Sequence, residues 1–91
     1  MMRSRFRRDL LPDPAAYYAK EGLTIVGTGE WRSANCVFHD DDRPSLRVRL
    51  ESGSFCCMSC GEKGHDIVAF HQRRHGTTFK ETARALGAWE D

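Results

Sequence analysis

The apolar residues of this chain change their spacing after about two thirds of its length. Between residues 23 and 58, short apolar runs are separated by glycine, proline and serine, a pattern typical of β-strands joined by turns. From Asp66 onward, apolar residues recur three or four positions apart, which indicates helices. The pattern therefore predicts an α+β domain with a small antiparallel sheet and flanking helices.

Four strands are predicted, over residues 23–26, 31–35, 45–50 and 55–58. The third run has the clearest alternation, because Leu46, Val48 and Leu50 are separated by Arg47 and Arg49. Side chains alternate between the two faces of a strand. One face of this strand should therefore be buried, while the other presents two arginines.

Helix signals occur at both ends of the domain. Residues 12–21 are predicted as a helix with Asp13 as its N-cap and Gly22 just past its end. A second helix should begin after Asp66 and stop at Gly76, and a third should follow the capping box at residues 78–81. The apolar stripe of the third helix consists of Phe79, Ala83 and Leu86. Residues 1–11 are expected to be a flexible basic arm, and residues 12–91 the folded domain.

Length and cysteine content point to a metal. A domain of 91 residues buries only roughly 60–65% of its unfolded surface, so it often depends on a metal or disulfides. The N-terminus has charges and prolines where a secretory signal needs apolar residues, and no apolar run is long enough to cross a membrane. We therefore expect a cytoplasmic protein whose four cysteines are reduced, so that they indicate a zinc site rather than disulfides. The net charge of +1 excludes a strongly basic protein, so any basic surface must be local.

Two sets of four zinc ligands are possible. The first set, Cys36, His39, Cys57 and Cys60, gives C-x-x-H and, after a gap of 17 residues, C-x-x-C. The other set joins Cys57 and Cys60 to His71 and His75. In a ββα zinc finger about 12 residues separate the cysteine pair from the histidines, whereas here ten do, which would turn the wrong helix face to the metal.

The first set fits its surroundings better. C-x-x-H and C-x-x-C-G are each typical of a tight turn at a strand end, and Gly61 suits the left-handed backbone after the second ligand. We therefore predict one structural zinc ion bound by Cys36, His39, Cys57 and Cys60. Cys56 is then interpreted as a small core residue, and His71 and His75 as a solvated helix face.

Two stretches resemble a known family. CVFHDDDRPSL, from Cys36 to Leu46, resembles the C-P-F-H-x-E-x-T-P-S-F stretch in the zinc-binding domain of DnaG-type bacterial and phage DNA primases. Residues 55–70 are similar to that family's Y-x-C-F-G-C-G-x-x-G-D-x-I-x-F run, and residues 79–83 to the start of its second helix. The sequence departs from the family pattern at Val37, Leu46 and Ser59, where the family has proline, an aromatic residue and glycine.

The resemblance implies a zinc-ribbon sheet that engages single-stranded DNA template when a primer is begun. It also implies the same four zinc ligands. The magnesium-binding catalytic domain of the primases has no counterpart in this chain, so no enzymatic activity is expected of it. A primase catalytic domain or another replication protein would be its partner.

Two functions from different classes follow. The first is a nucleic-acid-binding zinc module of DNA replication, with Arg47 and Arg49 contacting phosphates and Arg32 and Trp31 adding a cation and a stacking surface. The second is a zinc-stabilised protein-interaction module that docks on a replication or regulatory partner. Arginines beside a tryptophan on an exposed strand face favour the first.

Overall fold

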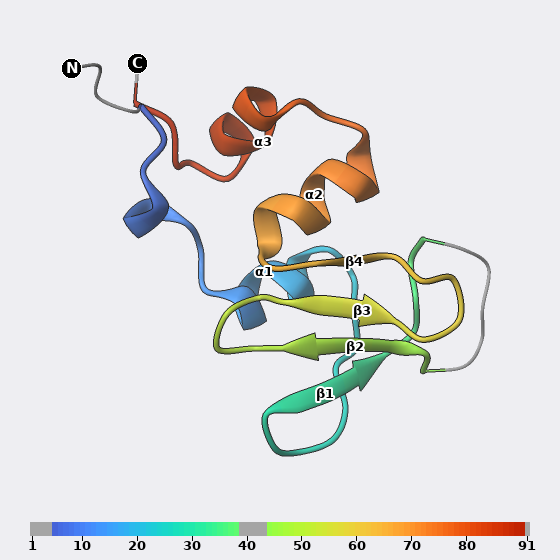
Figure 1. Ribbon diagram of the computed structural model, residues 1–91. Helices are drawn as coiled ribbons and strands as arrows, with labels where there is room; N and C mark the ends of the chain where they lie inside the picture. The colour runs from blue at the N-terminus through green and yellow to red at the C-terminus, as the bar shows by residue number, and fades with distance from the viewer. Residues whose placement is uncertain (1–4, 39–43, 91) are drawn as a thin grey trace.

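The computed structural model describes residues 5–38 and 44–90 of the chain (Figure 1). A short 3-10 helix, η1 (Arg8–Leu10), precedes α1 (Pro14–Lys20). The sheet then follows, and its strands are β1 (Trp31–Ala34), β2 (Leu46–Arg49), β3 (Phe55–Cys57) and β4 (Lys63–Gly64). Two helices, α2 (Ile67–His75) and α3 (Phe79–Ala85), complete the described chain. The predicted α+β class is confirmed.

All four strands belong to one antiparallel sheet in the order β1-β2-β3-β4. Leu46 pairs with Ala34 on one side and with Cys57 on the other, and Val48 pairs with Phe55. Paired residues in adjacent strands point to the same face. The pairing therefore gathers Leu46, Val48 and Phe55 on one face, where all three are buried.

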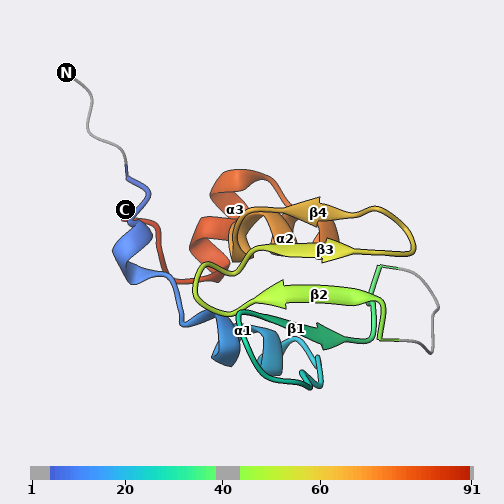
Figure 2. The same cartoon turned by 60° about the horizontal axis from the view of Figure 1, so that its bottom comes forward.

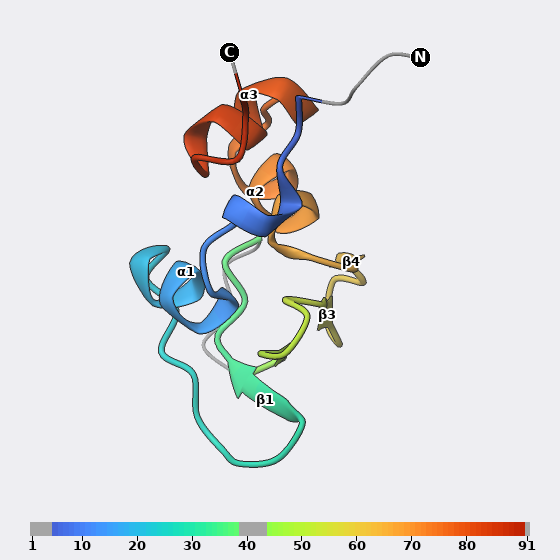
Figure 3. The ribbon, with the colours of Figure 1, turned by 90° about the vertical axis from the view of Figure 1, so that its left-hand side faces the viewer.

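That buried face carries the core of the molecule. Tyr18 from α1 and Phe70 from α2 are fully buried, with ring centroids 4.8 Å apart, and Phe70 lies 5.2 Å from the ring of Phe55. Both helices lie on this side of the sheet, and no helix within residues 5–38 and 44–90 lies on the opposite side (Figure 3). The apolar alternation of β2 thus produces one packed face and one open face.

The helix ends follow the local sequence signals. Asp13 and Asp66 cap α1 and α2 by accepting backbone N–H bonds, and Gly76 ends α2 with a φ of 67°. At α3, the side chain of Thr78 accepts from the N–H of Glu81 while Glu81 accepts from the N–H of Thr78. The predicted capping box is therefore confirmed, and it fixes the turn between α2 and α3.

Two sequence-based expectations are wrong. Residues 23–26 form no strand, and only Val26 pairs with Ser33 in an isolated bridge. Residues 5–7 do not form a separate arm, because the backbone of Arg7 donates to Ala88 and that of Glu90 donates to Arg5. The described start and end of the chain lie side by side in Figures 1 and 2. Pairing with the C-terminal segment satisfies backbone groups that the local sequence alone left without partners.

The third helix packs mainly against α2. Within its apolar stripe Ala83 is fully buried, whereas Phe79 is 44% exposed. The ring of Phe79 stacks edge-on against Phe6 at 4.9 Å, so this apolar residue covers the N-terminal segment and not the core. Among the residues that the structure describes, no helix is long and apolar enough to span a membrane.

Candidate metal centre and nucleic-acid interface

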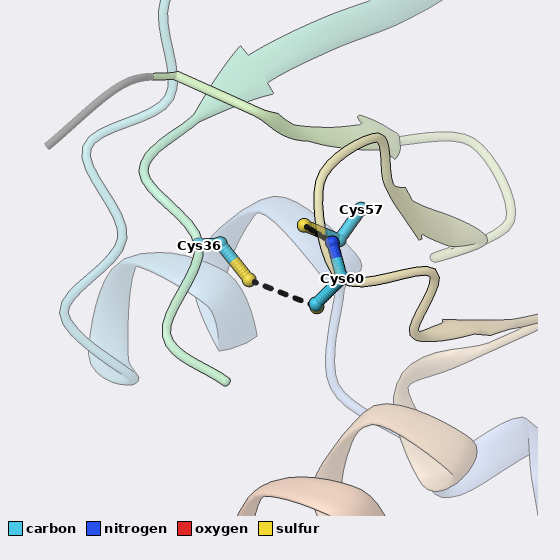
Figure 4. Close-up of side chains that lie close together, drawn as sticks. All are labelled: Cys36, Cys57 and Cys60. Carbon is cyan, nitrogen blue, oxygen red and sulfur yellow. Dashed lines mark hydrogen bonds between the residues drawn. The ribbon is translucent and has the colours of Figure 1, made fainter. Parts of the chain in front are cut away.

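Three cysteines meet at one end of the sheet. Cys36 lies just after β1, Cys57 is the last residue of β3, and Cys60 lies in the turn between β3 and β4. Their sulfur atoms are all within 4.8 Å of one another, and the Sγ atoms of Cys36 and Cys60 are 3.8 Å apart (Figure 4). The sheet order explains why they meet. The last residues of β1 and β3 both pair with the first residue of β2, so the two strands end at the same end of the sheet, on either side of β2.

Backbone N–H groups surround these sulfur atoms. The N–H of Cys60 donates to the Sγ of Cys57 at 3.4 Å, and the N–H of Phe38 donates to the Sγ of Cys36 at 3.4 Å. The turn is closed by a bond from the N–H of Gly61 to the carbonyl of Cys57, with Gly61 at a φ of 79°. A glycine is needed there because other residues rarely adopt this conformation. The predicted turn around C-x-x-C-G thus takes the form that a metal-binding knuckle requires.

The pKa values of the two buried thiols, Cys36 and Cys57, are shifted in opposite directions. Burial raises the pKa of Cys36, and the neighbouring thiols add to that shift. Burial also opposes ionisation of Cys57, but hydrogen bonds from the backbone of Cys60, the hydroxyl of Ser45 and the backbone of Ser59 bring its pKa below the ordinary value. Several thiolates so close together repel one another unless a cation lies between them.

The cluster fits a zinc ion. Thiolate sulfur is a preferred zinc ligand, and tetrahedral structural sites take four such protein ligands. Three of the four predicted ligands are therefore brought together by the structure. The fourth, His39, lies outside the described residues, one position beyond Phe38.

The structure does not bring the alternative ligand set together. Cys57 and Cys60 cluster with Cys36, whereas His71 and His75 form a separate group with Glu21. The two histidines are not a plain solvated face either, which corrects our interpretation. Nδ1 of His71 lies 2.8 Å from the hydroxyl of Tyr17, and burial together with His75 lowers the pKa of His71.

The open face of the sheet holds three of the four predicted nucleic-acid residues. Trp31 pairs with Arg49 across β1 and β2, and the next pair on the same face is Ser33 with Arg47. Trp31 is 42% exposed and Arg47 is exposed. Arg32 pairs with the buried Val48 and so points to the other face, contrary to our expectation. Neighbours in a strand alternate, so Arg32 and Trp31 cannot share one face.

Arg49 is less available than Arg47. Its guanidinium forms ion pairs with Glu30 and, at 3.4 Å, with Glu51. No ion pair with Arg47 occurs among the residues that the structure describes. Of the two arginines on β2, Arg47 is therefore the one whose charge no described carboxylate pairs with.

Sequence reasoning missed Lys63. This lysine pairs with Cys56, and Cys56 pairs with Arg47, so all three point to the open face. The interpretation of Cys56 as a core residue is wrong for the same reason, and its partial exposure agrees. The two-residue strand β4 was too short to show an alternating pattern, but its basic residue beside a glycine was visible in the sequence.

A hollow of about 700 Å³ adjoins this face. Trp31, Cys56 and Lys63 line it together with His65 and Arg73. Aromatic and basic side chains around an open hollow can stack a base and bind its phosphates. On the side of the hollow nearest α2, Gly64 lies so close to Phe55 and Ala69 that any larger side chain there would collide with them.

Comparisons with known proteins agree with the cysteine cluster. The model of a family described as CHC2 zinc finger matches residues 20–90. The DNA primase of Mycolicibacterium smegmatis is 43% identical over 51 residues, which are 56% of this chain and 8% of that protein. The Gene 58 protein of Mycobacterium phage D29 is 33% identical over 55 residues, which are 60% of this chain and 42% of that protein.

A solved structure has the same fold. The zinc-binding and RNA polymerase domains of the Aquifex aeolicus primase match with a TM-score of 0.74 and 28% identity, over 99% of this chain and 23% of that one. The chain therefore spans only a small part of the primases that it matches. Together with the three clustered thiols, these likenesses identify the centre as a structural zinc site.

Proposed function

Because the chain belongs to the CHC2 zinc finger family, we propose that it is a zinc-stabilised module that binds single-stranded nucleic acid in DNA replication. The chain is a zinc domain of the DNA-primase type. Template binding is the part that we propose. We also propose that primer synthesis belongs to a separate catalytic domain, to which this module presents the template strand.

The observation that carries this proposal is the open face of the sheet. Arg47, Cys56 and Lys63 form one row across β2, β3 and β4, and the exposed Trp31 lies in the adjacent row. Arg47 and Lys63 supply two positive charges, and the indole supplies a flat surface on which a base can stack. Basic and aromatic side chains together are typical of surfaces that bind single strands, and no helix of the described chain covers this one (Figure 3).

The zinc ion supports this surface from the edge of the sheet. We propose Cys36, His39, Cys57 and Cys60 as its ligands, in the Cys-His-Cys-Cys order of the sequence. A zinc ion held by these residues fixes the end of β1 to the turn after β3. The register of β1, β2 and β3 would then be fixed, and with it the alignment of Trp31, Arg47 and Cys56 on one face.

A direct binding measurement tests the proposal. Fluorescence anisotropy of labelled single-stranded and duplex oligonucleotides should show preferred binding of single strands, weakening as salt increases. The zinc-loaded protein is used, and protein treated with a chelator serves as the control. Absence of binding to any single strand at low salt would contradict the proposal.

A protein-interaction role is the second candidate, and one observation favours it. Met58 lies between the zinc ligands Cys57 and Cys60, and it is 72% exposed. Flexible methionine side chains are frequent on surfaces that bind other proteins. A primase catalytic domain or another replication protein is the partner we would expect. If Met58→Ala abolished binding to such a partner while the oligonucleotides did not bind, this second function would replace the first.

A further inference from the structure

A second group of metal-ligand side chains lies outside the cysteine cluster. Glu21, at the C-terminal end of α1, is brought together with His71 and His75 of α2. One potential ligand atom from each residue lies within 4.8 Å of the other two. We propose that these three residues form a second, weaker site for a divalent metal ion of the zinc type, which joins α1 to α2.

The spacing of the histidines suits this role. Residues four apart lie on the same face of a helix, and two histidines at this spacing are a recurrent zinc-binding pair. The ring centroids of His71 and His75 are 4.3 Å apart. Glu21 approaches the pair from a different element, with its Oε1 atom 2.6 Å from Nε2 of His75. Because the ligands come from two elements, a bound ion would cross-link α1 to α2.

Only small side-chain movements are needed. Ligand atoms around a tetrahedral zinc ion with bonds of 2.0–2.1 Å lie about 3.3 Å apart. The hydrogen-bonded atoms of Glu21 and His75 must therefore separate by less than about 1 Å, and the remaining pairs, which lie within 4.8 Å, exceed the required separation by about 1.5 Å at most. Two imidazoles and one carboxylate would leave the fourth position for water.

Tyr17 prepares the site by fixing two of its ligands. Its hydroxyl donates to Oε1 of Glu21 at 3.2 Å and lies 2.8 Å from Nδ1 of His71. When Nδ1 of His71 carries the hydrogen, it can donate to the Tyr17 oxygen while the Tyr17 hydroxyl donates to Glu21. This leaves the lone pair of His71 on Nε2, the form of the ring that binds metals.

The site is open to solvent. A hollow of about 260 Å³ is lined by Tyr17, Glu21 and His71 together with residues of α1 and the end of α3. The side chain of His75 is 40% exposed. An ion can therefore enter without unfolding, and a weaker, exchangeable site is expected in contrast to the thiolate centre.

Cobalt separates the two sites by spectroscopy. The thiolate centre is first filled with one zinc ion per chain, and Co²⁺ is then titrated into this protein. One further cobalt ion should bind with the weak absorption bands of nitrogen and oxygen ligands, without a sulfur-to-cobalt charge-transfer band. Filling the site should also raise the melting temperature by several degrees, because the ion binds only the folded state.

Variants assign the ligands. His75→Ala and Glu21→Gln should each weaken cobalt binding by more than about tenfold, since even the loss of an outer hydrogen-bond partner costs 10- to 100-fold. Tyr17→Phe, which removes such a partner, should weaken it about tenfold. His65→Ala is the matched control, because His65 is exposed and lies outside the cluster. It should leave cobalt binding unchanged.

Three results would overturn the proposal. Zinc-loaded protein could bind no cobalt at millimolar concentration, in which case the cluster is a hydrogen-bond network only. Cobalt could bind equally well to His75→Ala and Glu21→Gln, so that the ion sits elsewhere. Bound cobalt could also always show the sulfur-to-cobalt charge-transfer band, which would mean that it had replaced zinc at the cysteines.

Discussion

Arg47 lies directly opposite Cys56 in the pairing of β2 with β3, so both side chains point to the face of the sheet that carries no helix. Lys63 continues the row on β4. The distance between neighbouring strands is about 4.8 Å, and the two cations are separated by two strand spacings. Both side chains are long and flexible, so Arg47 and Lys63 can reach phosphates of one extended strand across this separation.

The first prediction concerns these two cations. Each phosphate contact adds about 0.7 to the slope of log affinity against log salt for single strands. Replacing both in Arg47→Ala/Lys63→Ala should therefore flatten the slope by roughly 1.4. The melting temperature should hardly change, because both side chains are exposed. Anisotropy titrations at several salt concentrations provide the measurement.

Arg49→Ala is the matched control for that experiment. Its guanidinium already pairs with Glu30 and Glu51, so its removal should change the salt slope by much less than removal of Arg47. An equal effect of Arg49→Ala would mean that nucleic acid displaces the carboxylates. An unchanged slope in the Arg47/Lys63 double variant would remove the open face from consideration.

The second prediction concerns Trp31. Stacking of a base on an aromatic ring contributes about 1–3 kcal/mol and involves no net charge. Trp31→Ala should weaken binding by that amount, while the salt slope stays the same. Trp31→Phe should recover part of the affinity. If Trp31→Ala bound as tightly as the unchanged protein, the indole would have a structural role in the sheet and no contact with nucleic acid.

The sequence predicted best what is encoded locally. Caps at Asp13, Asp66 and Thr78 need only residues three positions away, so their patterns were sufficient. The meeting of Cys36 with Cys57 and Cys60 was also predicted, because metal-ligand spacing is a strong constraint.

Relationships between distant segments could not be predicted in the same way. The ion pair of Arg49 with Glu30 depends on the register of β1 against β2, which no single strand encodes. The contact of Glu21 with His75 joins residues 54 positions apart. The pairing of residues 5–7 with the C-terminal segment likewise required the whole chain to be folded.

The third prediction tests the close approach of α2 to the sheet. A Cβ atom added at Gly64 would lie 2.6 Å from Cε1 of Phe55 and 2.7 Å from Cβ of Ala69. Overpacking of this kind costs about 1–3 kcal/mol, so Gly64→Ala should lower the free energy of unfolding by that amount. Lys63→Ala, the next residue in β4, should leave it unchanged. Thermal unfolding of zinc-loaded protein measures both.

The fourth prediction concerns the capping box of α3. Replacing Thr78 with alanine removes the acceptor for the N–H of Glu81 and should cost about 1 kcal/mol of stability. Hydrogen bonds from the backbone and side chain of Thr78 lower the pKa of Glu81. A carboxyl whose pKa is lower in the folded state stabilises the fold above the pKa of its unfolded form.

The sign of the pH effect follows directly. The contribution of Glu81 should be fully present from about pH 5 upward and be lost as the pH falls through its folded-state pKa, which lies below the ordinary value of a glutamate. Glu81→Gln should therefore lower the melting temperature equally at pH 5.5 and pH 7.5, in the presence of excess zinc. A difference that grew between these two pH values would contradict this assignment.

The fifth prediction concerns the zinc ligands. Zinc ligation supplies on the order of 10 kcal/mol in small zinc domains, so a chelator should unfold the sheet around the cysteine cluster. Tight zinc binding should be abolished by each of four substitutions, as measured by metal content after dialysis and by circular dichroism: Cys36→Ser, His39→Ala, Cys57→Ser and Cys60→Ser.

Cys56→Ser is the matched control, because Cys56 points to the open face, away from the cluster. His71→Ala should also retain the tightly bound ion, since His71 belongs to the separate group with Glu21. If His71→Ala lost the tight zinc ion while Cys36→Ser retained it, the ligand assignment would be wrong, and with it the way in which the metal fixes β1 to the turn after β3.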